Sequence, residues 1–139
     1  YASRGLGDVY KRQFPVYAID YVSDEKQMAR LYNAVDAYVT PSLEDNLPNT
    51  IVEALSCGVP CVGFNVGGIP EMIDHLHNGY VAQRKSSEDL ANGIHWVLTE
   101  PEYAELSAQA CRKAIGNYSE SIIAKKYTEV YNKITGKYA

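Results

Sequence analysis

Two carboxylate side chains, Asp45 and Glu53, stand eight positions apart where an acidic loop passes into a helix. The loop spans 41–48 after a short apolar run, and Glu53 lies one turn into a helix predicted to start near Asn49. Ionised carboxylates accept charge-assisted hydrogen bonds from hydroxyl groups, which suits ribose and hexose rings better than phosphate. The spacing therefore allows both groups to reach one sugar-containing ligand, although a helical glutamate is more often a solvated surface residue.

The start of the same helix is suited to binding an anion. The N–H groups of Asn49, Thr50 and Ile51 are free of intrahelical partners there, at the positive end of the helix dipole, and Pro48 adds no competing hydrogen-bond donor. A diphosphate fits such an end. The alternative is that Asn49 only caps the helix, and the sequence favours neither interpretation.

Short apolar runs alternate with helical patterns around these residues. Strands are predicted at 16–19, 37–40, 59–64 and 80–82. Ser23 can cap a helix before the second strand, and a short helix is expected at 69–74. This alternation is typical of an α/β fold with a Rossmann-like parallel sheet flanked by helices.

The second half of the chain is predicted to be helical. Ser86 and Asp89 have the spacing of a capping box, and an apolar stripe follows them. Pro101 suits the first turn of a helix at 101–115, and Ser119 begins a last helix. The chain is therefore expected to end in two or three helices.

The motifs taken together resemble glycosyltransferase family 4, whose members are retaining GT-B enzymes with an E-x7-E motif. The resemblance rests on the spaced carboxylates, on Ala-Leu-Ser-Cys-Gly-Val-Pro at 54–60 and on Gly-Gly-Ile-Pro-Glu at 67–71, and it runs from about 16 to 134. The family's first glutamate falls on Asp45, because Glu44 is one position too far from Glu53. The Glu-Asp-Asn-Leu-Pro-Asn-Thr variant at 44–50 is similar to branches that build bacterial surface polysaccharides.

The resemblance implies that 14–139 is a truncated GT-B C-terminal domain that binds a sugar nucleotide. Asp45 or Glu44 would bind hydroxyls of the transferred sugar, Glu53 the ribose, and the amides of 46–50 the diphosphate. The residues implied to bind the sugar nucleotide are Glu44, Asp45, Asn46, Leu47, Asn49, Thr50 and Glu53. Further candidates are Ser42, Gly67, Gly68 and Glu71, for which turn and cap geometry is the alternative.

The same resemblance places other parts of the enzyme upstream of the matched segment. These are the Arg/Lys pair that neutralises the leaving diphosphate and the N-terminal domain that binds the acceptor. Residues 1–13 lack periodicity and are expected to be a non-native or disordered leader, so Arg4, Lys11 and Arg12 do not replace the pair. No catalytic residue is therefore expected within the fragment, which is expected to be inactive alone.

Composition excludes several other classes of function. A net charge of -4 gives no broad basic surface for nucleic acid, and no apolar run reaches the roughly 18 residues of a membrane span. The histidines have no partners at metal-ligand spacing, so neither a metal nor a cofactor is expected. Three cysteines without a CxxC pair fit a reducing compartment, and a cytoplasmic location is expected, with peripheral membrane association of the parent.

The predicted function is that of a retaining glycosyltransferase fragment. Its parent would transfer a sugar from a nucleoside-diphosphate sugar to a glycan or lipid-linked acceptor, in surface polysaccharide synthesis. One alternative is a catalytically inactive fragment that binds sugar nucleotides or is merely structural. A second is a non-hydrolysing sugar-nucleotide epimerase, which shares the fold but matches the sequence only in general layout.

Overall fold

The computed structural model describes residues 15–136, and the leader expected at 1–13 lies outside them. Its centre is a parallel sheet of three strands in the order β1-β2-β3, with β1 at Tyr38–Thr40, β2 at Cys61–Phe64 and β3 at Gly79–Ala82. Val39 lies opposite Val62 in the register. Because all three strands run in the same direction, their carboxyl ends meet at one edge of the sheet.

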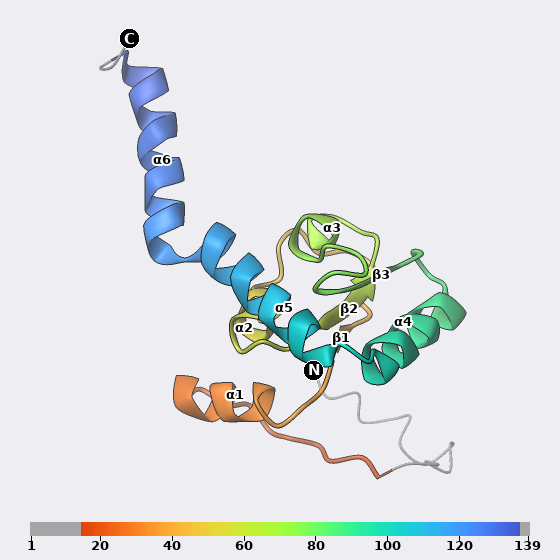
Figure 1. The fold of residues 1–139 in the computed structure, drawn as a ribbon. Coiled ribbons are helices and arrows are strands. Elements are labelled where there is room, and N and C mark those ends of the chain that lie inside the picture. The colour runs from red at the N-terminus through yellow and green to blue at the C-terminus, as the bar shows by residue number, and fades with distance from the viewer. Residues whose placement is uncertain (1–14, 137–139) are drawn as a thin grey trace.

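Helices cover both faces of this sheet (Figure 1). On one face Cys61 packs in a buried cluster with residues of α2 (Asn49–Ser56) and α5 (Tyr103–Tyr118). On the other face Val62 packs against Val97 of α4 (Ser87–Thr99). Successive strand residues point to opposite faces, so this division follows from the strand itself. The predicted α/β architecture with a Rossmann-like parallel sheet is confirmed.

The remaining helices differ in how much they bury. Helix α1 (Glu25–Tyr32) lies against α2, and α3 (Ile69–Met72) fills the turn after β2. Helix α6 (Glu120–Thr135) buries no residue and extends away from the sheet in Figure 1. The predicted helical end of the chain is confirmed by α4, α5 and α6, the last three elements.

Two local predictions near the beginning of the described chain are wrong. Residues 15–24 have no regular structure, and Val16 and Ile19 are 57% and 62% exposed, so 16–19 is not a strand. A strand needs a hydrogen-bonded neighbour, and none of the three described strands pairs with this run. The cap of α1 is Asp24 rather than Ser23, because the N–H of Gln27 donates to Asp24 Oδ2 at 2.9 Å.

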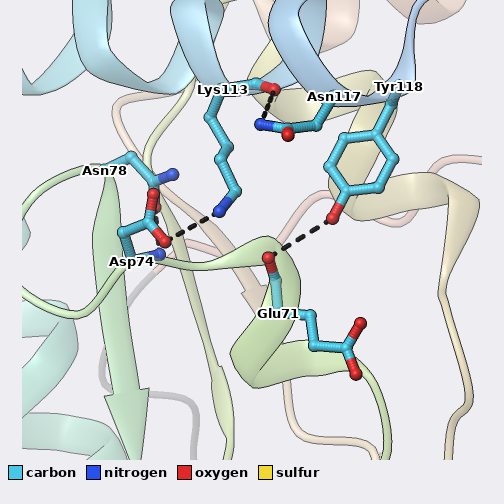
Figure 2. A network of polar contacts seen from close by, with 6 residues as sticks. All are labelled: Glu71, Asp74, Asn78, Lys113, Asn117 and Tyr118. Carbon is cyan, nitrogen blue, oxygen red and sulfur yellow. Dashed lines mark hydrogen bonds and ion pairs between the residues drawn. The ribbon is translucent and has the colours of Figure 1, made fainter. Parts of the chain in front are cut away.

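A polar network fastens α5 to α3 and to the segment between α3 and β3 (Figure 2). Lys113 Nζ lies 2.8 Å from Asp74 Oδ1, and the Tyr118 hydroxyl donates to the carbonyl oxygen of Glu71 at 3.3 Å. The N–H of Asp74 donates to Oδ1 of the buried Asn78 at 2.9 Å. Since Asn78 directly precedes β3, the network fixes the point at which that strand begins.

Candidate functional site

Three loops meet at the carboxyl edge of the sheet. Residues 41–48 follow β1, 65–68 follow β2 and 83–86 follow β3. Ligands of open α/β sheets bind outside the carboxyl ends of the strands. The topology therefore places the predicted acidic loop at the edge where a ligand is expected.

The glycine pair after β2 packs directly against the acidic loop. Gly67 has a positive φ of +50°, and a Cβ atom there would overlap the carbonyl oxygen of Asp45. A Cβ atom on Gly68 would overlap the carbonyl oxygen of Asn46 and press on the side chain of Leu47. Only glycine fits both positions. The glycine pair forms a tight turn, and the packing of this turn holds the acidic loop in place.

A hollow of about 480 Å³ opens between these loops. Its polar lining consists of two carboxylates, two amides and one guanidinium, which together offer acceptors and donors to a polyhydroxyl ligand. Glu44 and Asn46 are exposed there, while Asp45 is half-buried. The residues that line it are Leu43, Glu44, Asp45, Asn46, Asn65, Val66, Gly67 and Arg84.

Arg84 is a residue of this hollow that the sequence analysis missed. It lies on a turn held by two hydrogen bonds, from Gln83 N–H to Asp89 Oδ2 at 2.6 Å and from Ser86 N–H to the Gln83 carbonyl at 3.0 Å. The Gln83 N–H, followed by the Tyr80 hydroxyl, holds the pKa of Asp89 below its usual value. The available signal was positional, because Arg84 follows the last strand of a parallel sheet.

The start of α2 has no side-chain cap. Pro48 occupies the cap position and its carbonyl accepts the N–H of Ile51 at 3.0 Å, so the proposed capping by Asn49 is wrong. Asn49 and Thr50 are exposed. Within 15–136 their N–H groups have no hydrogen-bond partner, and they remain available to an anion at the positive end of the helix.

Glu53 faces a different hollow from Asp45. Its Oε2 accepts a hydrogen bond of 3.0 Å from the hydroxyl of Tyr32. Both residues line a hollow of about 520 Å³ between α1, α2 and residues 21–23. The two spaced carboxylates therefore line two different hollows, and the uncapped helix start lies between them in the sequence.

The other predicted residues take supporting positions. Ser42 Oγ lies 3.2 Å from Thr40 Oγ1, which ties the loop to the end of β1. Glu71 is on α3, and its exposed carboxylate points away from the Tyr118 hydroxyl in Figure 2. Within 15–136, no group of three His, Cys, Asp or Glu side chains is placed to hold a metal ion. None of the helices in that range combines the length and apolarity needed to cross a membrane.

Comparison with known proteins identifies the family. Residues 15–115 match the model of the Glycosyl transferases group 1 family. The chain belongs to this family. It is 28% identical over 118 residues to the N,N'-diacetylbacillosaminyl-diphospho-undecaprenol alpha-1,3-N-acetylgalactosaminyltransferase of Campylobacter jejuni, covering 84% of the chain and 31% of that protein. It is 32% identical over 114 residues to the D-inositol 3-phosphate glycosyltransferase of Rhodococcus erythropolis, covering 81% of the chain and 26% of that protein.

Solved structures agree with this assignment. Anabaena Alr3699/HepE in complex with UDP-glucose matches with a TM-score of 0.68 and 26% identity, over 76% of the chain and 30% of that protein. Sucrose-phosphate synthase from Thermosynechococcus elongatus matches with a TM-score of 0.71 and 23% identity, over 81% of the chain and 29% of that protein, which supports the fold. The described residues are thus part of a GT-B glycosyltransferase fold. The chain spans less than a third of the length of these relatives.

Proposed function

We propose that this chain binds the nucleoside-diphosphate sugar of a retaining glycosyltransferase of family 4. The observation that carries the proposal is the uncapped start of α2, where the N–H groups of Asn49 and Thr50 have no hydrogen-bond partner within 15–136. In the sequence this helix start lies between Asp45, which lines one ligand-sized hollow, and Glu53, which lines another. We place the diphosphate at the helix start, the sugar at Asp45 and the nucleoside at Glu53.

Each part of such a ligand has matching chemistry. Glu44, Asp45 and Asn46 would accept hydrogen bonds from hydroxyls of the transferred sugar. The N–H groups of Asn49 and Thr50 would bind the diphosphate, helped by the helix dipole. The carboxylate of Glu53 would bind the ribose hydroxyls in the hollow of about 520 Å³, a volume within the range of ligand pockets. The UDP-glucose complex of the Anabaena relative supports this class of ligand.

The reaction of the whole parent protein is part of the proposal. The bond between the anomeric carbon and the diphosphate oxygen would break, a bond to an acceptor hydroxyl would form with retention, and that hydroxyl would lose its proton. The name of the Campylobacter relative, a transferase acting on an undecaprenol-linked diphosphosugar, supports a lipid-linked acceptor. The proposed role in surface polysaccharide synthesis rests on the sequence variant at 44–50. The nucleoside-diphosphate sugar is a substrate, and no protein-bound metal is included.

A second candidate is a catalytically inactive fragment that binds the same ligand. Activity requires an acceptor site and fixed cations for the leaving diphosphate. Transfer from a labelled sugar nucleotide to added acceptors, measured with the longer parent protein, separates the two candidates, because the chain alone is expected to be inactive in both cases.

An amide NMR titration tests the binding proposal. The chain is titrated with UDP-glucose, GDP-mannose and glucose 1-phosphate, which lacks the nucleoside and one phosphate. We expect one sugar nucleotide to shift resonances of 44–50 and of Glu53 together, and glucose 1-phosphate to leave Glu53 unmoved. Dispersed resonances that no sugar nucleotide moves would contradict the proposal.

The variants Asp45→Asn and Glu53→Gln make the titration specific. Each variant keeps the shape of the side chain and removes its charge. Each should lower the affinity for the sugar nucleotide by about tenfold, which corresponds to the loss of one charge-assisted hydrogen bond. The exposed Glu120, at the start of α6, gives the matched control Glu120→Gln. This control should bind as the parent chain does.

A further inference from the structure

Tyr32 is the last residue of α1, and its ring is held firmly in place. Only 6% of the residue is exposed, and the ring meets that of Tyr38 edge to face at 5.8 Å and 73°. A buried ring with a packed aromatic neighbour has few alternative rotamers. The position of the Tyr32 hydroxyl is therefore fixed by the core.

The direction of the hydrogen bond between Tyr32 and Glu53 is also fixed. Burial, and then the Glu53 carboxylate, raise the pKa of Tyr32 well above its ordinary value, so the phenol stays protonated. A protonated phenol donates and an ionised carboxylate only accepts, which makes Glu53 Oε2 the acceptor at 3.0 Å. Within 15–136, Oε1 of Glu53 has no hydrogen-bond partner and is available to a ligand.

Glu53 needs such a partner because it is exposed on α2. An exposed glutamate samples many rotamers, and fixing it on binding costs side-chain entropy. The hydrogen bond from Tyr32 restricts the rotamers of Glu53 before the ligand arrives, so less side-chain entropy is lost on binding. The carboxylate is then held on the wall of the hollow that both residues line.

We propose that Tyr32 is a positioning residue that orients the Glu53 carboxylate toward the ribose hydroxyls of the nucleotide. The inference rests on the proposed function, since it needs a nucleotide in the hollow between α1 and α2. It gives Tyr32 a selective effect. A nucleotide that lacks ribose hydroxyls makes no hydrogen bond to the oriented carboxylate. Its affinity should therefore not change when the Tyr32 hydroxyl is removed.

A purely structural role for the same hydroxyl makes a different prediction. If the Tyr32 hydroxyl only joins α1 to α2, its removal would make the hollow less rigid. The affinity of every nucleotide would then fall by a similar factor. Ligands with and without ribose hydroxyls therefore distinguish the two roles. The variant Tyr32→Phe keeps the buried ring, so the core contacts that the cluster requires are retained.

The experiment is isothermal titration of the chain with UDP and GDP and with their 2′,3′-dideoxy counterparts. Of UDP and GDP, we take the one that binds the unaltered chain. We expect Tyr32→Phe to lower the affinity of this ribonucleotide by about tenfold, the effect of one hydrogen bond to a charged group. The affinity of its dideoxy counterpart should stay unchanged. In the Glu53→Gln background, the same change should have no further effect. Tyr38→Phe removes a hydroxyl from the neighbouring ring and is the matched control, with unchanged affinities.

The possible failures are separable. If the unaltered chain binds neither UDP nor GDP, the proposed function fails, and the role of Tyr32 fails with it. If a ribonucleotide binds and Tyr32→Phe does not change its affinity, only the positioning role is overturned. An equal loss for the ribonucleotide and its dideoxy counterpart also overturns it, because that result indicates a structural role. Thermal unfolding of Tyr32→Phe confirms that the compared proteins are folded.

Discussion

Gly67 lies so close to Asp45 that a side-chain carbon on the glycine would overlap the carbonyl oxygen of the aspartate. The contact joins the loop after β1 to the loop after β2, two segments far apart in the sequence. It means that the acidic loop keeps its place because a glycine with positive φ stands beside it. The glycine pair and the carboxylate motif thus act as one packing unit.

Gly67→Ala should destabilise the chain by about 1–3 kcal/mol, since alanine is strained at this φ and its Cβ has no space. We also expect amide resonances of 43–47 to move, because the acidic loop must shift to admit the methyl group. Thermal unfolding and amide NMR measure the two effects.

Gly116→Ala is the matched control for this prediction. Gly116 lies within α5, where a Cβ atom would meet nothing within 4 Å. Alanine is favoured over glycine inside a helix by up to about 1 kcal/mol, so this variant should be slightly more stable than the parent chain. Equal stabilities for the two variants would contradict the packing role of Gly67.

Local patterns predicted most of the fold but not the partners of individual side chains. Apolar runs identified β1, β2 and β3, because a strand buried between helices must be apolar. The run at 16–19 has the same character, yet pairing depends on a neighbouring strand that its own residues do not specify. Sequence periodicity gave no indication that Tyr32 would meet Glu53, because their contact depends on the packing of α1 against α2.

The capping box at the start of α4 shows the same limit. Ser86 Oγ accepts the N–H of Asp89 at 3.1 Å, as predicted. The Asp89 carboxylate does not accept the N–H of Ser86, which donates to the Gln83 carbonyl oxygen instead. It accepts the Tyr80 hydroxyl at 2.8 Å and the Gln83 N–H at 2.6 Å, and so holds the turn that carries Arg84. A tertiary contact has replaced the local one, and the residue spacing alone could not indicate it.

Asp89 should make the stability of the chain depend on pH in the acid range. Its pKa is lowered in the folded chain, chiefly by the Gln83 N–H, so its stabilising effect is present above the unfolded value of about 4. The effect is lost as the pH falls through the lower folded value. Asp89→Asn should therefore be less stable than the parent chain at neutral pH, with a smaller difference in strong acid.

Urea unfolding at several pH values measures this effect. Glu88→Gln, at the exposed neighbouring position on α4, removes the same charge and serves as the control. We expect Asp89→Asn to lose more stability than this control at neutral pH, because Asp89 accepts the Gln83 N–H. A loss for Asp89→Asn that does not change with pH would show that the carboxylate does not stabilise the Gln83 turn through its charge.

Arg84 should contribute to the binding of the sugar rather than the nucleotide. It lines the hollow with Glu44 and Asp45, apart from the hollow of Glu53. Arg84→Gln should lower the affinity for a sugar nucleotide by about three- to tenfold, the effect of one or two hydrogen bonds. The affinity for the corresponding nucleoside diphosphate should stay unchanged. Lys85→Gln removes the same charge from the same turn and should affect neither ligand. Equal losses for both ligands with Arg84→Gln would contradict the separation of the two hollows.

The two ion pairs on α5 should differ in strength because they differ in burial. The Lys113 side chain is 18% exposed and joins Asp74 within the network that precedes β3, whereas both members of the pair between Arg112 and Glu105 are more than half exposed. Lys113→Met should cost about 1 kcal/mol of stability, and Arg112→Met less than about 0.5 kcal/mol. Urea unfolding at low and high salt measures both, and added salt should reduce the smaller effect first because the exposed pair is more strongly screened. A larger loss for Arg112→Met would show that α5 is not fastened to the start of β3 through Lys113.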